Sequence, residues 1–244
     1  MPIVIELRLK ASWPVRPDTR QLHGLACALF EGEASGHLGH DKPFAVWPLR
    51  AAPPGSAHDW EWRAAWLPAG PPPASVIGPE QLRLGHVTCD VTEAAHRSVS
   101  HAQLAAGPPL ASVTLAFGSP TYFAQNGADV VIPDPRLIAG SWHRRWNASV
   151  PASALAIGED AWRETHRALH LAAFDLRTGR RDSGRGHDRA GFTGTATLRL
   201  ARDAPAAARS VLGTLARFAE FCGTGAQTTH GFGATTVTSG PQVP

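Results

Sequence analysis

The stretch IVIELRLKASWPVRPDTRQLHGLACALFEGE, residues 3–33, joins a strand pattern to a helix pattern. Over residues 3–9 apolar side chains alternate with the charged Glu6 and Arg8, as in a strand with one buried face. Asp18 and Gln21 then resemble a capping box at the start of a helical pattern over residues 18–33, in which apolar residues from Leu22 to Phe30 recur at helical spacing. We therefore expect a strand followed by an amphipathic helix.

Outward from this stretch, the first half continues with two strand-like runs, a short helix and a further strand. They are expected at residues 43–49, 59–67, 74–82 and 83–91. The order strand, helix, strand, strand, helix, strand is that of a ferredoxin-like unit. Trp60, Trp62 and Trp66 share one face of the second run, which is typical of a core. Exposed aromatics on such a sheet would instead suit a general RNA-binding module of the RRM type.

The second half repeats the order. Its elements are expected at residues 111–117, 135–146, 167–176, 192–202, 204–221 and 234–238, and Gly223 is a normal stop for the long helix. We therefore predict an α+β fold of two tandem ferredoxin-like (RRM-like) domains, each an antiparallel sheet with helices on one face. The predicted domains are residues 1–108, with a histidine-containing loop, and residues 109–244, with a glycine-rich loop.

The composition is that of an ordered globular protein. Of 244 residues, 43% are hydrophobic and 18% charged, and no apolar run approaches the ~20 residues of a membrane span. The first ten residues resemble a strand rather than a signal peptide. Cys27, Cys89 and Cys222 are far apart, as in a protein with reduced thiols. We expect a cytoplasmic protein without a membrane partner.

Positive charge is concentrated in the second half. Residues 1–110 contain nine Lys and Arg against ten Asp and Glu, whereas residues 111–244 contain fourteen against ten. Five of these arginines fall in one expected hairpin tip, at Arg177, Arg180, Arg181, Arg185 and Arg189. A flexible basic finger suits the backbone of a nucleic acid, although a solvated loop has the same composition.

Two other segments carry candidate chemistry. Residues 223–233, GTGAQTTHGFG, would let backbone N–H groups approach an anion, with a structural turn as the alternative. Residues 37–44, HLGHDKPF, bring His37 and His40 close to Lys42. Histidines suit general acid–base chemistry, and a lysine can stabilise developing charge. A metal site is the other interpretation, but the sequence offers no further ligand cluster, so we expect none.

Several of these segments resemble the CRISPR repeat-processing endoribonucleases of the RAMP superfamily. The resemblance is carried by Gly223, Gly225, Thr228, Gly231, Phe232 and Gly233, by residues 117–123, 133–136, 145–147 and 191–194, and by His37 ahead of Lys42-Pro43-Phe44. It covers the second half almost throughout and the first half around residues 37–49. The second histidine, His40, and Trp47 depart from the family pattern.

The resemblance implies cleavage of precursor CRISPR RNA within each repeat to make guide crRNAs, without metal or cofactor. The 2′-hydroxyl of the RNA would attack the adjacent phosphate and leave 2′,3′-cyclic phosphate and 5′-hydroxyl ends. His37, His40 and Lys42 would be the catalytic residues. The expected RNA contacts are Arg136, Arg144, Arg145, Arg177, Arg180, Arg181, Arg185, Arg189, Gly223, Gly225, Thr228, Gly231 and Gly233.

The implied partner is CRISPR repeat RNA, expected as a stem-loop, and not DNA. Other subunits of a CRISPR effector complex are further candidate partners. The alternative function is that of a non-catalytic RAMP subunit that only binds crRNA in such a complex. It would share the fold and the glycine-rich loop but would not need His37.

Overall fold

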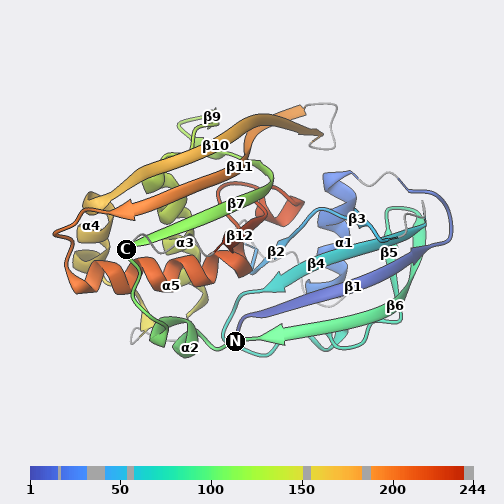
Figure 1. Cartoon of the computed structure of the whole chain (residues 1–244). Helices are drawn as coiled ribbons and strands as arrows, with labels where there is room; N and C mark the ends of the chain where they lie inside the picture. The colour runs from blue at the N-terminus through green and yellow to red at the C-terminus, as the bar shows by residue number, and fades with distance from the viewer. Residues whose placement is uncertain (16–17, 32–41, 54–57, 151–154, 183–187, 239–244) are drawn as a thin grey trace.

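The structure is a computed structural model that describes residues 1–15, 18–31, 42–53, 58–150, 155–182 and 188–238. Two antiparallel sheets lie side by side, one from each half of the chain (Figure 1). Helices pack against both sheets. The predicted α+β class is therefore confirmed.

The first half forms the sheet that contains the N-terminal strand. Its elements are β1 (Ile3–Ala11), α1 (Thr19–Glu31), β2 (Phe44–Val46), β3 (Arg50–Ala51), β4 (Asp59–Trp66), the 3-10 helix η1 (Ala74–Val76), β5 (Gln81–Leu84) and β6 (Val87–Ser98). The strand order is β2-β4-β1-β6-β5, with β3 beside β4. With β4 and β6 as third and fourth strands, this is the ferredoxin-like arrangement. The helix predicted at residues 74–82 shrinks to η1, because Gly78 turns with φ +72 and Pro79 follows it.

Helix α1 begins at the capping box that the sequence predicts. The Gln21 backbone N–H donates to Asp18 Oδ1 at 2.7 Å, and the Asp18 N–H donates to Gln21 Oε1 at 3.2 Å. The apolar face of α1 packs on the sheet, where Trp62 is buried and Trp60 and Trp66 are half-buried in the same cluster. The tryptophan face is therefore core, which excludes these three rings as an exposed RNA-stacking platform.

The second half forms the other sheet. Its elements are β7 (Ser112–Thr121), β8 (Phe123–Gln125), β9 (Ala128–Val130), α3 (Pro135–Ser149), α4 (Glu159–Ala168), β10 (Leu169–Asp182), β11 (Asp188–Leu200), α5 (Ala206–Cys222), the 3-10 helix η3 (Thr228–His230) and β12 (Thr235–Thr238). The order β10-β11-β7-β12 repeats the ferredoxin-like arrangement, and β8 and β9 form a separate ribbon. Helix α4 is an element that the sequence analysis did not predict.

One hydrophobic cluster crosses from the first sheet into the second. From the first sheet it contains Val4, Ala45, Trp47, Ala65 and Leu67, and from the second half it contains members such as Leu115, Phe218 and Phe221. Arg63 adds a polar link, because its Nη2 donates to the Glu220 carbonyl at 2.9 Å. The short helix α2 (His101–Ala106) lies between the halves in the sequence. A domain boundary between residues 108 and 109 remains a prediction.

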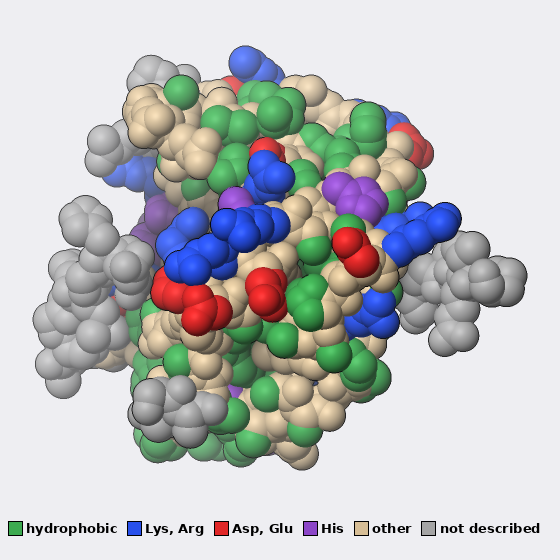
Figure 2. Space-filling model, turned by 90° about the vertical axis from the view of Figure 1, so that its left-hand side faces the viewer, with side chains coloured by type: hydrophobic (Ala, Val, Ile, Leu, Met, Phe, Trp, Pro, Cys, Tyr) green, Lys and Arg blue, Asp and Glu red, His purple; other side chains and the backbone are tan. Residues whose placement is uncertain are grey.

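Figure 2 shows the end of the molecule where α4 lies, with basic side chains gathered beside acidic ones. The exposed charges of α4 itself are mixed and comprise Glu159, Asp160, Arg163, Glu164 and Arg167. Arg163 pairs with Asp160 at 3.0 Å. This helix therefore does not form a purely basic surface. None of the helices in the described ranges combines the length and the apolar character needed to cross a bilayer.

Candidate active site at the junction of the two sheets

The glycine-rich loop follows α5 and lies against the first half of the chain. Gly223 ends α5 with φ +66, and its N–H donates to the Ala219 carbonyl at 2.9 Å. Within the loop, η3 contacts both β2 and α1 (Figure 1). The loop therefore brings residues of the second half next to residues of the first.

Two of the loop glycines are required by the loop's own backbone. A Cβ on Gly225 would overlap the carbonyl oxygen of Tyr122, and a Cβ on Gly233 would overlap that of Thr224. Both glycines have positive φ, which other residues rarely adopt. The space that a side chain would need at either position is thus filled by the backbone of this chain.

The other predicted loop residues divide by burial. Gly223, Thr228, Gly231 and Gly233 are buried, whereas Gly225 is half-buried and lines a groove. The four buried residues therefore act through the shape of the loop, and Gly225 is the member of this set that faces a ligand-sized space.

A groove of about 450 Å³ opens where the loop meets α3 and the start of β2. Lys42 lines it from the first half, Arg144 and Arg145 from α3, and residues between Gly225 and His230 from the loop. No carboxylate is among the described residues that line the groove. Guanidinium groups match the geometry of phosphate oxygens, so the groove is suited to a phosphodiester.

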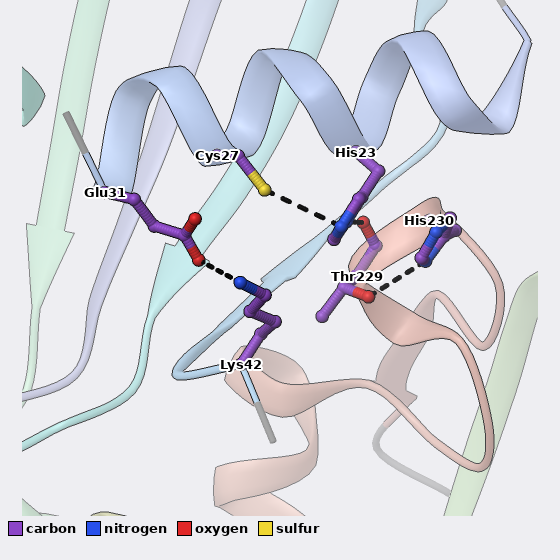
Figure 3. A network of polar contacts seen from close by, with 6 residues as sticks. All are labelled: His23, Cys27, Glu31, Lys42, Thr229 and His230. Carbon is purple, nitrogen blue, oxygen red and sulfur yellow. Dashed lines mark hydrogen bonds and ion pairs between the residues drawn. The ribbon is translucent and has the colours of Figure 1, made fainter. Parts of the chain in front are cut away.

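Lys42 does not stand alone in this groove. Its Nζ lies 2.6 Å from Oε1 of Glu31 on α1, and the two side chains are 12% and 4% exposed (Figure 3). The carboxylate compensates the ammonium charge. Lys42 is therefore a weaker candidate for the cation than its sequence position indicates, and Arg144 and Arg145 add two further guanidinium groups to the groove lining.

Two histidines from opposite halves stack beside this ion pair. The rings of His23 on α1 and His230 in η3 have centroids 4.0 Å apart and planes 8° apart. Burial, and then the neighbouring His23, lower the pKa of His230 to about 4. His230 is therefore neutral near pH 7, where a neutral imidazole can accept a proton.

A chain of hydrogen bonds connects the two histidines to their surroundings. His23 Nδ1–H donates to the Thr229 carbonyl at 3.0 Å, and His23 Nε2 lies 3.6 Å from Cys27 Sγ. Burial and then Glu31 raise the pKa of Cys27 to about 11, so the thiol keeps its proton. Thr229 Oγ1 lies 2.9 Å from His230 Nδ1. Figure 3 shows all of these residues between α1 and the loop.

The remaining predicted site residues either lie outside the described residues or, where described, do not line the groove. His37, His40 and Arg185 lie outside the described residues. Arg136, at the start of α3, directs Nε toward the His166 carbonyl at 3.3 Å and thereby links α3 to α4. Among the described ranges, no group of three or more His, Cys, Asp or Glu side chains is placed to hold a metal ion.

Four arginines of the predicted finger, Arg177, Arg180, Arg181 and Arg189, lie in the strands of the β10–β11 hairpin and not in its tip, because both strands continue further than expected. Arg177 and Arg180 are exposed. Arg181 is half-buried beside Gly231, and its burial lowers the pKa of its guanidinium. Arg189 forms an ion pair with Asp129 and lies over the Tyr122 ring, 5.5 Å from its centroid. The hairpin is confirmed, but Arg189 is already partly compensated within the chain.

His23 and His230 were not predicted as site residues. His230 had a usable signal, because it is the histidine inside the glycine-rich segment itself. His23 had none, since a histidine on an amphipathic helix shows nothing of the loop that will pack on it.

Two ferredoxin-like units with a glycine-rich loop at their junction define a protein of the RAMP superfamily. The family model for the CRISPR-associated endoribonuclease Cas6 matches residues 115–235. The chain belongs to this Cas6 family of CRISPR repeat-processing endoribonucleases.

Solved Cas6 structures are similar over almost the whole chain. The Cas6 (TTHB231) product complex is 29% identical, covers 98% of this chain and 99% of that chain, and has a TM-score of 0.83. The Cas6 (TTHA0078) product complex is 25% identical over 97% and 100%, with a TM-score of 0.79. Thermus thermophilus Cas6 (TTHB231) is 28% identical over 98% of each chain, with a TM-score of 0.70. Among curated proteins, none matches this sequence.

Proposed function

We propose that this protein is a metal-independent endoribonuclease that cleaves precursor CRISPR RNA within its repeats and so produces guide crRNAs. The 2′-hydroxyl 5′ of the cut attacks the adjacent phosphate, and the products carry a 2′,3′-cyclic phosphate and a 5′-hydroxyl. The observation that carries the proposal is the groove in which Arg144, Arg145 and Lys42 converge with the imidazole of His230.

The chemistry needs a base, an acid and positive charge near the phosphate. Arg144 and Arg145 supply the charge. His37 and His40 are the proposed proton-transfer residues, and both are close to Lys42 along the chain.

The relatives favour RNA cleavage over RNA binding alone. Two similar Cas6 proteins, 29% and 25% identical, are known as product complexes. The basic lining of the groove in this protein is suited to holding a cleaved RNA. Repeat RNA, as a stem-loop, is therefore the proposed substrate, and association with other CRISPR subunits remains a prediction.

The direct test incubates the protein with the repeat RNA of its host in EDTA and maps the cut. We expect one cut per repeat and a 2′,3′-cyclic phosphate, identified by mass spectrometry of the 5′ fragment. Cleavage that requires magnesium would contradict the metal-free mechanism. Tight binding without any cut would favour the non-catalytic RAMP subunit instead.

Arg144 provides a test of the groove as the phosphate site. Its side chain is exposed at the groove wall, so removing it should leave the fold intact. We expect Arg144→Ala to weaken RNA binding and to reduce the slope of log affinity against log salt by about 0.7–0.9, the contribution of one neutralised phosphate. Binding isotherms at several salt concentrations measure both quantities.

Arg163→Ala is the matched control for Arg144→Ala. Arg163 is also an exposed arginine on a helix of the second half, but it pairs with Asp160 on α4. Its removal should change neither affinity nor slope. An unchanged salt slope for Arg144→Ala, or an equal change for Arg163→Ala, would mean that the RNA phosphates lie elsewhere.

A further inference from the structure

We propose that His230 is the general base of the cleavage reaction and that Thr229 and His23 are its positioning residues, an assignment that rests on the proposed function. The reaction needs one group that takes a proton and another that gives one. His37 and His40 come from one segment of the first half. The structure adds a third imidazole, from the second half, in the wall of the groove.

The ring of His230 is held from two directions (Figure 3). One face stacks on His23, with centroids 4.0 Å apart and planes 8° apart. The Nδ1 edge lies 2.9 Å from Thr229 Oγ1. None of the described residues forms a hydrogen bond with Nε2 of His230, so this nitrogen remains available to a ligand in the groove.

The base role requires the tautomer of His230 with its proton on Nδ1, and Thr229 Oγ1 is placed to accept that proton at 2.9 Å. When Nδ1–H of His230 donates to Thr229 Oγ1, Nε2 carries the lone pair. Thr229 is in turn fixed by His23, whose Nδ1–H donates to its carbonyl at 3.0 Å. His23 Nε2 accepts from the thiol of Cys27. The positioning chain therefore runs from α1 through Thr229 to the ring of His230.

Burial is the main reason that His230 is neutral, and the neighbouring His23 is the second. The titratable groups around η3 are His23, Cys27 and Glu31 on α1, Lys42 ahead of β2, Arg144 and Arg145 on α3, and Arg181 of β10 beside Gly231. Burial and His23 lower the pKa of His230 to about 4. The ring therefore enters the reaction able to accept a proton.

The proposed step balances in atoms and charge. His230 Nε2 takes the proton of the 2′-hydroxyl while the 2′ oxygen bonds to the adjacent phosphorus. The bond from phosphorus to the 5′ oxygen breaks, and the 5′ oxygen takes a proton from the acid. This assignment leaves the role of the acid to His37 or His40.

The test measures single-turnover cleavage by His230→Gln on two RNA substrates. One has the natural 5′ oxygen at the cut, and the other has sulfur in its place, which leaves without a proton from an acid. A variant that lacks the base stays slow on both substrates, by about 10²–10⁴-fold. It also loses the rising limb of the pH–rate profile. Restoration of the rate on the sulfur substrate would make His230 the acid and overturn the assignment.

Two controls keep this result interpretable. Glutamine keeps a polar side chain beside Thr229, and the melting temperature of His230→Gln verifies the fold. His86→Ala removes an exposed histidine from the β5–β6 turn and should cleave at the wild-type rate. Wild-type cleavage by His230→Gln would overturn only the present inference. Absence of cleavage by the wild-type protein would instead contradict the proposed function.

The positioning role of Thr229 has its own readout. Thr229→Val keeps the side-chain shape but loses the acceptor for His230 Nδ1–H. Since small misplacements of a catalytic group can cost up to about 10²-fold, we expect kcat to fall by up to that factor with KM unchanged. Thr229→Ser, which retains the hydroxyl, should recover most of the rate. Equal defects in the valine and serine variants would show that the hydroxyl does not act through His230.

Discussion

A repeat RNA with one deoxyribose immediately 5′ of the cut is expected to stay intact while it binds with the affinity of the all-ribose RNA. The 2′-hydroxyl is the nucleophile of the proposed reaction, so its removal leaves nothing to attack the phosphate. The phosphates that meet Arg144 and Arg145 are unchanged, and binding is therefore retained. Single-turnover cleavage and equilibrium binding of the two RNAs in EDTA measure both effects.

The position of the deoxyribose supplies the control. The same substitution one nucleotide to the 3′ side leaves the nucleophile in place, and this RNA should be cut at the normal rate. Cleavage of the RNA that lacks the nucleophile would mean that water attacks the phosphate. The 2′,3′-cyclic product would then be excluded as well.

His37→Ala is expected to slow single-turnover cleavage by about 10²–10⁴-fold, the usual cost of losing a general acid or base. RNA affinity should stay near that of the wild-type protein, because Arg144 and Arg145 remain in the groove lining. Rates at saturating protein separate the two quantities. The same loss is expected whether His37 donates the proton as an acid or accepts it as a base.

His40→Ala is the matched comparison, since it removes a second histidine from the same segment. If the cleavage rate falls strongly in His40→Ala and only slightly in His37→Ala, the proton-transfer role belongs to His40 and not to His37. Wild-type rates in both variants would remove this segment from the chemistry. The first half of the chain would then contribute only Lys42 and its neighbours to the groove.

Elements with a local cause were predictable from sequence. The capping box of Asp18 and Gln21 forms as expected, and Gly223 ends α5. Elements fixed by distant partners were not. Residues 92–98 lie beyond the strand expected at residues 83–91, but they continue β6 because β1 supplies a paired strand along them. The sequence of the segment alone does not indicate that a distant strand will pair with it.

The candidate site also combines residues that the sequence predicts with contacts that depend on distant partners. Lys42, Arg144, Arg145 and Gly225 were predicted, and the fold brings them together around one groove. The partner of Lys42 was not foreseen, because Glu31 comes from the helix across from it. His230 was passed over although it lies in the quoted motif, since its neutral state depends on burial and on His23.

The hydrophobic cluster shared by the two sheets also restricts how RNA enters and leaves. Opening the molecule like a hinge between its halves would expose Trp47, Leu67 and Phe218 to water. Exposed apolar surface costs roughly 25 cal/mol per Å², so such a motion is strongly opposed. We therefore expect Lys42 and the loop to keep their separation while RNA binds and while the product leaves.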